Sequence, residues 1–174
     1  GRKELLIWSA ASSSGEEPYT LAMIIDNKYK KELNGISLKI VGTDISTEIL
    51  NQAKNGIYNE YSVRNVPNNF MESYFRQDGM KYILSDDIKK YVEFMHVNLI
   101  DMDEMDKLKG ADIIFCRNVL IYFDAVSKTK VVSKLYDNLN RGGYLFIGHS
   151  ESLHGISKAF KLVHFNKSIA YKKE

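Results

Sequence analysis

One stretch near the start of the chain constrains the fold most, because it joins an apolar strand to a helix through a turn of small residues. It is residues 7–19, I-W-S-A-A-S-S-S-G-E-E-P-Y, and a helical pattern of apolar residues follows it. The proline suits the first turn of a helix, where its missing N–H group is no loss, and Ser14 or Gly15 can cap the helix. A strand, a tight turn and a helix N-terminus in this order are typical of α/β folds that hold a nucleotide-like ligand.

The turn differs from the glycine-rich turns that bind pyrophosphate. Those turns carry G-x-G-x-x-G, whose bare N–H groups meet phosphate oxygens at the positive end of a helix. Here only Gly15 is present, and Glu16 and Glu17 place negative charge at that end. Carboxylates repel a phosphate but accept hydrogen bonds from ribose hydroxyls or an ammonium group. The turn therefore favours a positively charged cofactor without phosphate, such as S-adenosylmethionine (SAM), over a nicotinamide dinucleotide. An ordinary capped helix, whose glutamates complement the helix dipole, explains the same residues equally well.

Composition excludes several classes of protein. The 174 residues suffice for one domain with a sizeable core. A formal net charge of +2 gives no reason to expect nucleic acid or a membrane surface as a partner. The one cysteine, Cys116, excludes an internal disulfide and fits a reducing compartment. No stretch is long and apolar enough to span a bilayer, and no signal peptide opens the chain. We therefore expect a cytoplasmic, monomeric domain over residues 1–174 without membrane insertion.

Apolar segments alternate with helical patterns along most of the chain. Strands are expected at residues 4–9, 38–43, 91–97, 111–116 and 144–148, helices at 18–33, 46–54 and 124–138, and a closing hairpin at 160–166 and 168–173. This order predicts an α/β fold with a Rossmann-like, doubly wound and mostly parallel sheet that ends in an antiparallel hairpin. Residues 57–90 interrupt the pattern with aromatic residues among Asn, Asp and Gly. We expect them to form a small inserted β-subdomain, with a helix at 67–75 and a strand at 80–84.

Polar residues follow several of the expected strands at their carboxyl ends, which meet at one crevice in a parallel sheet. They are residues 9–17 of the turn, Asp44, Asn98, and the pair Arg117 and Asn118. Asp44 suits the two hydroxyls of an adenosine ribose, although it can also cap the helix that follows. The amide of Asn98 can read an adenine edge or simply form a turn.

The segment F-C-R-N-V-L-I-Y-F-D, residues 115–124, places a guanidinium directly after a buried strand. Such a charge is costly unless it is paired. Arg117 can pair with a carboxylate of a cofactor or substrate, or with Glu16 or Glu17.

Tyr122 is four positions after Asn118, so the two lie on the same side if the stretch is helical. We then expect the Tyr122 hydroxyl to project into the crevice, whereas Ile121 and Phe123 pack elsewhere. A core tyrosine is the alternative.

Other reactive residue types give weaker signals. Cys116 has no base or metal partner nearby in the sequence and is expected in the core. The four histidines lack the spacing of metal ligands, so we expect no metal site. His149, Ser150 and Glu151 follow the fifth strand without the G-x-S-x-G motif of hydrolases. We expect them to cap a following helix.

Several motifs, taken in order, closely resemble those of the bacterial chemotaxis receptor methyltransferases, the CheR family. They are W-S-A-A-S-S-S-G-E-E-P-Y, T-D-I-S-T-E-I-L, V-N-L, F-C-R-N-V-L-I-Y-F-D and G-H-S-E-S-L. The resemblance covers nearly the whole chain and implies a class I SAM-dependent methyltransferase fold with a small inserted β-subdomain. It also implies transfer of a methyl group from SAM to glutamate side chains of chemoreceptors, which leaves glutamyl methyl esters and S-adenosylhomocysteine.

The resemblance also implies roles for residues at the matching motif positions. The cofactor contacts would be Ala10, Glu17, Asp44, Asn98, Leu99, Arg117 and Asn118. Tyr122 would lie beside the methyl group and help to place the acceptor glutamate. That glutamate is already ionised at pH 7 and needs no strong base, so the enzyme would contribute mainly alignment and desolvation.

The chain departs from the family pattern at its start. Family members carry a helical N-terminal domain and a T-x-F-F-R-type segment before the first strand, and nothing here matches them. Since the first strand also begins within a few residues of Gly1, we expect a fragment with an incomplete catalytic constellation. The main alternative is a SAM-binding sensor or scaffold without turnover. A small-molecule methyltransferase, acting on free acids, is a further alternative.

Overall fold

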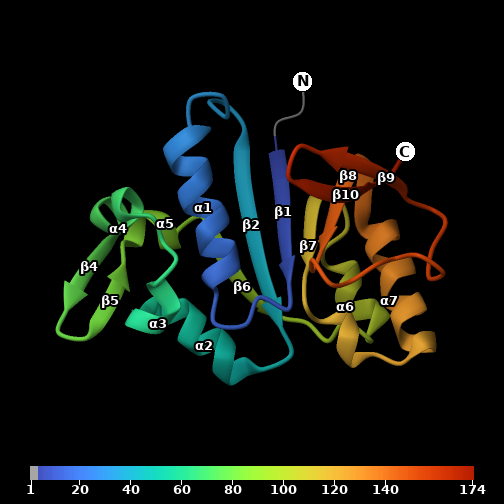
Figure 1. The fold of residues 1–174 in the computed structure, drawn as a ribbon, viewed down its shortest axis with the longest axis horizontal. Coiled ribbons are helices and arrows are strands. Elements are labelled where there is room, and N and C mark those ends of the chain that lie inside the picture. Colours follow the sequence, from blue (N-terminus) through green and yellow to red (C-terminus); the bar gives the residue numbers. More distant parts are fainter. Residues whose placement is uncertain (1–3) are drawn as a thin grey trace.

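The computed structural model describes residues 4–174, and its main element is a sheet of seven strands (Figure 1). The strands are β1 (Glu4–Ala10), β2 (Ser37–Asp44), β6 (Val92–His96), β7 (Ala111–Cys116), β8 (Leu139–Ile147), β9 (Lys161–Phe165) and β10 (Ser168–Lys172). Their order is β6-β2-β1-β7-β8-β10-β9. Neighbours from β6 to β8 are parallel, while β10 runs antiparallel to both β8 and β9. This arrangement confirms the predicted fold class.

Helices connect the parallel strands and bury the two faces of the sheet. They are α1 (Glu16–Lys28), α2 (Thr47–Asn55), α6 (Met102–Asp106) and α7 (Ala125–Asn138). Because side chains alternate along a strand, Trp8 packs in one core cluster with Leu135 of α7, whereas Ile7 packs in another with Met23 of α1. Cys116 is fully buried in the first cluster, as expected. No helix within residues 4–174 is long and apolar enough to cross a bilayer.

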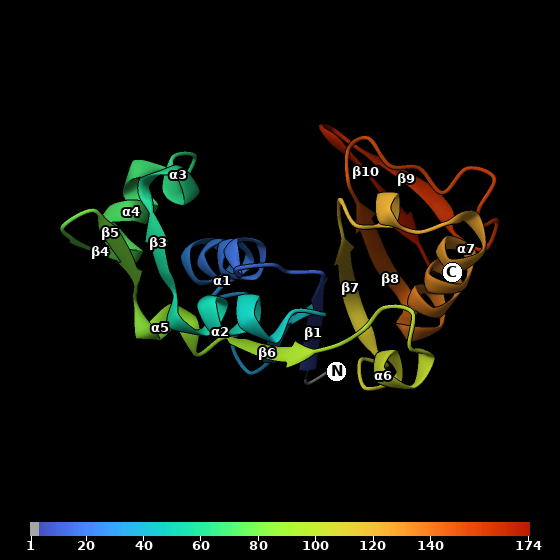
Figure 2. The same ribbon diagram turned by 90° about the horizontal axis from the view of Figure 1, so that it is seen from below.

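Residues 57–89 form a second sheet at the end of the molecule opposite the β9–β10 hairpin (Figure 2). Its strands, in the order β3-β5-β4, are β3 (Ile57–Asn59), β5 (Lys81–Leu84) and β4 (Phe75–Asp78), and α3 (Glu60–Val63), α4 (Asn68–Tyr74) and α5 (Asp86–Lys89) accompany them. The Tyr58 hydroxyl donates a hydrogen bond to the Ser14 carbonyl over 2.9 Å. The Tyr74 hydroxyl donates to Asp26 of α1 over 3.1 Å. The second sheet is therefore fastened to α1 and to the turn that precedes it.

Several predicted boundaries are wrong, each for a local reason. Helix α1 ends at Lys28 rather than near residue 33, because residues 29–35 are mostly exposed and have no core to pack on. Strand β8 begins at Leu139, before the predicted turn. The pairing of β8 with β7 shifts register across residues 139–144, where Gly142 has a φ of +82°. The turn is thus an irregularity inside one strand.

His149 and its neighbours do not cap a helix. Residues 148–160 connect β8 to β9 without a helix or strand. The carboxylate of Glu151 instead accepts hydrogen bonds from two backbone N–H groups. Glu151 therefore links the loop after β7 to the loop after β8 and does not cap a helix.

Candidate functional site

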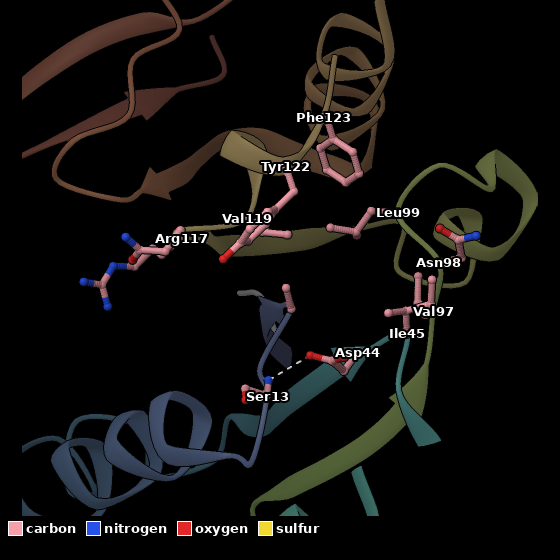
Figure 3. A pocket seen from close by; sticks show the side chains of 12 residues that line it. Ser13, Asp44, Ile45, Val97, Asn98, Leu99, Arg117, Val119, Tyr122 and Phe123 are labelled. Atoms are coloured by element: carbon pink, nitrogen blue, oxygen red, sulfur yellow. Dashed lines mark hydrogen bonds between the residues drawn. The ribbon is translucent and has the colours of Figure 1, made fainter. Parts of the chain in front are cut away.

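A cavity of about 550 Å³ lies at the carboxyl ends of the central strands (Figure 3). Its lining residues are Ala11, Ser13, Asp44, Ile45, Val97, Asn98, Leu99, Arg117, Asn118, Val119, Tyr122 and Phe123. Most of the sequence-predicted site residues are therefore brought together here. The others, Ala10 and Glu17, do not line the cavity: Ala10 is buried at the end of β1 beside Ala11, and Glu17 lies in the first turn of α1.

Asp44 ties the turn after β1 to the end of β2. Its Oδ2 atom accepts a hydrogen bond from the backbone N–H of Ser13 over 3.0 Å (dashed in Figure 3), and its Oδ1 atom accepts one from Ser46 over 3.1 Å. Ser46 itself caps α2 by accepting from Ile49, so capping does not depend on Asp44. A carboxylate has about four lone-pair sites. Asp44 therefore keeps acceptor capacity for ligand hydroxyls.

The turn needs the small residues that the sequence provides. Ala11 and Ser13 have φ values of +58° and +50°, in the left-handed region that few L-residues adopt. Gly15 has a φ of +89°, and a Cβ atom there would lie 2.9 Å from the ring of Phe94. The turn thus packs closely on the sheet. Without a larger side chain in the way, the main chain can approach a ligand directly.

Glu17 is held at both of its carboxylate oxygens. Arg117 donates to Oε2 over 3.0 Å, and the buried Ser9 hydroxyl donates to Oε1 over 2.7 Å. Of the partners considered for Arg117, the structure therefore shows Glu17, while Glu16 accepts from Ser14. No sequence pattern predicts the role of Ser9, because its hydroxyl reaches Glu17 only once β1 and α1 are packed together. The charged side chains of Glu17 and Arg117 are therefore held in position before any ligand binds.

Asn98 and Leu99 form the opposite side of the opening (Figure 3). The Asn98 backbone N–H donates to Glu104 over 2.6 Å, and its side-chain oxygen accepts from the backbone of Ile100 over 3.2 Å. The turn-forming role is therefore present. The side-chain nitrogen makes no hydrogen bond within residues 4–174, so it remains free to donate to a ligand. Leu99 is buried in the core and presents an apolar surface to the cavity.

Residues 117–123 form one wall of the cavity, and they are not one continuous helix. The prediction that Asn118 and Tyr122 share one side of a helix is therefore wrong. Asn118 has a φ of +58°, and only Leu120–Tyr122 forms a short 3₁₀ helix, η1. Both residues still line the cavity, and Tyr122 is 79% exposed, so the core-tyrosine alternative is wrong. Phe123, expected to pack elsewhere, lines the cavity as well.

The residues that sequence reasoning missed are largely apolar. Ile45, Val97, Val119 and Phe123 all line the cavity. Ile45 could have been predicted from the sequence, because it directly follows an acidic residue at a strand end. Phe123 could not, because the direction of its side chain depends on how the wall bends after Asn118.

The donor set fits a positively charged adenosine cofactor better than a phosphate-bearing one. Carboxylates occupy the α1 N-terminus, where a phosphate would bind, and the cavity is walled by aliphatic and aromatic side chains. Burial, with smaller contributions from the charges of Glu151 and Glu17, raises the pKa of the Cys116 thiol, so this group stays protonated and is not a nucleophile. Within residues 4–174, no group of three or more His, Cys, Asp or Glu side chains is arranged to hold a metal ion. The arrangement can bind and orient reactants without a covalent intermediate.

Comparison with known proteins gives a consistent result. The family model "CheR methyltransferase, SAM binding domain" matches residues 1–169. The chain is 45% identical over 169 residues to chemotaxis protein methyltransferase 2 of Vibrio cholerae, covering 96% of this chain and 58% of the relative. It is 38% identical over 176 residues to chemotaxis protein methyltransferase 1 of Pseudomonas aeruginosa, covering 99% of this chain and 64% of the relative. The chain thus spans less than two thirds of the length of either relative.

A solved structure assigned to the O-methyltransferases, from Nostoc punctiforme, superimposes with a TM-score of 0.52 at 15% identity. The match covers 82% of this chain and 32% of that protein. At such low identity the likeness concerns the fold alone.

Proposed function

The chain belongs to the CheR family of methyltransferases and its cofactor is SAM; we propose that the whole protein methylates glutamate side chains of chemotaxis receptors. One observation carries the proposal most. The cavity combines a ribose-type carboxylate, an arginine oriented by the neighbouring Glu17 and an exposed tyrosine, and its volume of about 550 Å³ is typical of small-molecule sites. The receptor as partner and the cytoplasmic location are part of the same proposal, supported by relatives named as chemotaxis methyltransferases. We further propose that the domain is a monomer and that residues 57–90 are a subdomain inserted in it.

The residues around the cavity divide the work of holding the cofactor. In this proposal Asp44 accepts the ribose hydroxyls, and Asn98 with Leu99 holds the adenine. Glu17, fixed by Ser9 and Arg117, accepts from the ammonium group at the other end. The cofactor also contacts Ala10, Arg117 and Asn118, at the ends of β1 and β7.

The protein's contribution to the reaction is placement and exclusion of water. When bound, SAM supplies a methyl group on a sulfonium, which is already an activated leaving group. The acceptor glutamate is ionised at pH 7, so the site needs no strong base. Tyr122 stands exposed at the mouth of the cavity, where its hydroxyl can donate a hydrogen bond to the acceptor carboxylate. Val119 and Phe123 form an apolar wall that limits water around the reacting groups.

Calorimetric titration of this chain with S-adenosylhomocysteine, with NAD as control, tests the cofactor site. Saturable binding of the first and none of the second is expected. Methyl transfer is then tested with the full-length protein, radiolabelled SAM and membranes that contain chemoreceptors. Base-labile label on receptor glutamates is the expected product. Binding without transfer would favour a sensor or scaffold, and methylation of free acids without receptor would favour a small-molecule methyltransferase.

A further inference from the structure

A single carboxylate joins the loops that follow β7 and β8, behind the wall of the cavity. The Oε2 atom of Glu151 accepts a hydrogen bond from the backbone N–H of Asn118 over 2.8 Å and another from that of Gly148 over 2.7 Å. Both bonds reach the same oxygen atom. Since the acceptor is charged, both are of the stronger, charge-assisted kind. We call this arrangement the Glu151 bridge.

The bridge holds Asn118 in an uncommon backbone conformation. Asn118 has a φ of +58°, where an L-residue crowds its own Cβ atom against the chain. Such conformations persist where surrounding contacts fix them. The bond from the Asn118 N–H to Glu151 is a contact of this kind.

Gly148 provides the space that the bridge needs. A Cβ atom at this position would lie 2.7 Å from Oε2 of Glu151, 3.0 Å from the backbone nitrogen of Asn118 and 3.1 Å from its side-chain nitrogen. The φ of Gly148 is outside the left-handed region, so alanine would meet no backbone strain there. The glycine is therefore explained by the close approach of these two loops.

The bridge anchors one end of the cavity wall, and the buried side chain of Leu120 holds its middle. At the far end of the wall, Asp124 caps α7 by accepting from the Ser127 N–H over 2.8 Å. At the near end, the bridge fixes Asn118, which follows the arginine that orients Glu17. Between these anchors lie Tyr122 and Phe123, which line the cavity. Releasing the near anchor would let Asn118 and Arg117 shift together.

We propose that Glu151 is a positioning residue for the cofactor site, acting through the backbone of Asn118 rather than by touching the cofactor. Its effect on cofactor affinity rests on the proposed function, whereas the bridge itself does not. The second oxygen, Oε1, is buried and has no hydrogen-bond partner within residues 4–174. Glutamine keeps one carbonyl oxygen that can accept both bonds, but it removes the charge and places an amide NH2 group where Oε1 has no partner in the described part of the chain.

The test compares Glu151→Ala with Glu151→Gln in this chain, with Ser150→Ala as an exposed control in the same loop. Amide hydrogen exchange by NMR reports the bridge without any cofactor, and calorimetry reports the affinity for S-adenosylhomocysteine. In Glu151→Ala, the Asn118 and Gly148 amides should lose protection, and the dissociation constant should rise about tenfold because, of the two lost charge-assisted bonds, the one at Asn118 holds a residue that lines the cavity. Glu151→Gln keeps an acceptor oxygen but not the charge, so it should lose less than Glu151→Ala in both measurements, whereas Ser150→Ala should stay close to wild type.

Gly148→Ala is the second variant, and it should reproduce the loss from the opposite side of the bridge even if Glu151→Ala fails to fold. Wild-type protection and affinity in Glu151→Ala or Gly148→Ala would overturn the proposal. Equal losses in the Gln and Ala variants would overturn it too, since they would show that the charge matters and the hydrogen bonds do not. A wild-type chain that does not bind S-adenosylhomocysteine would count against the cofactor site alone, because the exchange measurement would still test the bridge.

Discussion

Replacing Asp44 by alanine should weaken cofactor binding strongly, and the structure allows the size of the effect to be worked out. Two backbone N–H groups, those of Ser13 and Ser46, already use part of the acceptor capacity of this carboxylate. The remaining lone pairs are available to the two hydroxyls of a ribose. Hydrogen bonds to a charged group contribute about 1.5 kcal/mol or more each. Two of them amount to about 3 kcal/mol, or roughly a hundredfold in affinity.

Asp101 offers a matched control for this variant. It also accepts from two backbone N–H groups, those of Asp103 and Glu104, and caps α6 near the same edge of the sheet, but it does not line the cavity. Asp101→Ala should therefore lose a cap worth about 1 kcal/mol of stability and leave the affinity for S-adenosylhomocysteine unchanged. Calorimetry gives the affinity, and thermal unfolding of the same samples gives the stability.

Binding of S-adenosylhomocysteine by Asp44→Ala within a few-fold of wild type would show that Asp44 holds the turn and contacts no ligand. An equal loss of binding in Asp101→Ala would show that the loss follows stability rather than a ligand contact. A loss well above a hundredfold would indicate that release of Ser13 disorders the turn as well. Amide exchange at Ser13 separates that contribution.

Further predictions concern the reaction and the stability of the fold. Tyr122→Phe should leave affinity for S-adenosylhomocysteine nearly unchanged and lower kcat of the full-length enzyme, because the exposed hydroxyl is placed to hold the acceptor; a large loss of affinity would make Tyr122 a cofactor contact instead. Burial raises the pKa of Asp26, but hydrogen bonds from Lys30 and two tyrosine hydroxyls outweigh it and leave the pKa below its ordinary value of 3.8. The stability from this group should therefore be present above about pH 4 and be lost as the pH falls through the lowered folded-state pKa, and Asp26→Asn should flatten the acid side of the melting-temperature profile. The Lys173 ammonium donates to carbonyls at the end of α7, so Lys173→Met should lower the melting temperature by about 2–4 °C per kcal/mol lost. Lys167→Met, in the exposed β9–β10 turn, should not change it.

The bounds of a helix or strand were predicted to within about a residue where the segment's own sequence marks its ends. Strand β7 spans Ala111–Cys116 as predicted, because a run that is apolar except for Asp112 marks a strand buried on both faces. Helix α7 runs from its Asp124 cap to Asn138, since a capping aspartate fixes one end and Leu139 leaves the helix into β8. The end of α1 was missed because residues 29–35 have helical residue types but no surface to pack against.

Several of the polar residues that line the cavity could be predicted for a related reason. Parallel strands bring their carboxyl ends to one edge, so a polar residue directly after each strand lands at the cavity without any knowledge of loops. Asp44, Asn98 and Arg117 were found this way, and all line it. Phe123 was not, because the wall bends at the left-handed Asn118 and no local sequence pattern predicts that conformation.

The partners of the site residues decide how the site works, and only the pairing of Arg117 with Glu17 was among the alternatives that the sequence offered. Ser13 and Asp44 are 31 positions apart, Asn118 and Glu151 are 33 apart, and Glu17 and Arg117 are 100 apart. Each pair meets only after the sheet has formed, and each fixes a group at the cavity before any ligand arrives. A preformed site loses little conformational freedom on binding. Most of the conformational entropy of these site residues is therefore lost when the sheet folds rather than when the cofactor binds. Variants that loosen these pairs should lower the affinity for the cofactor without removing a ligand contact.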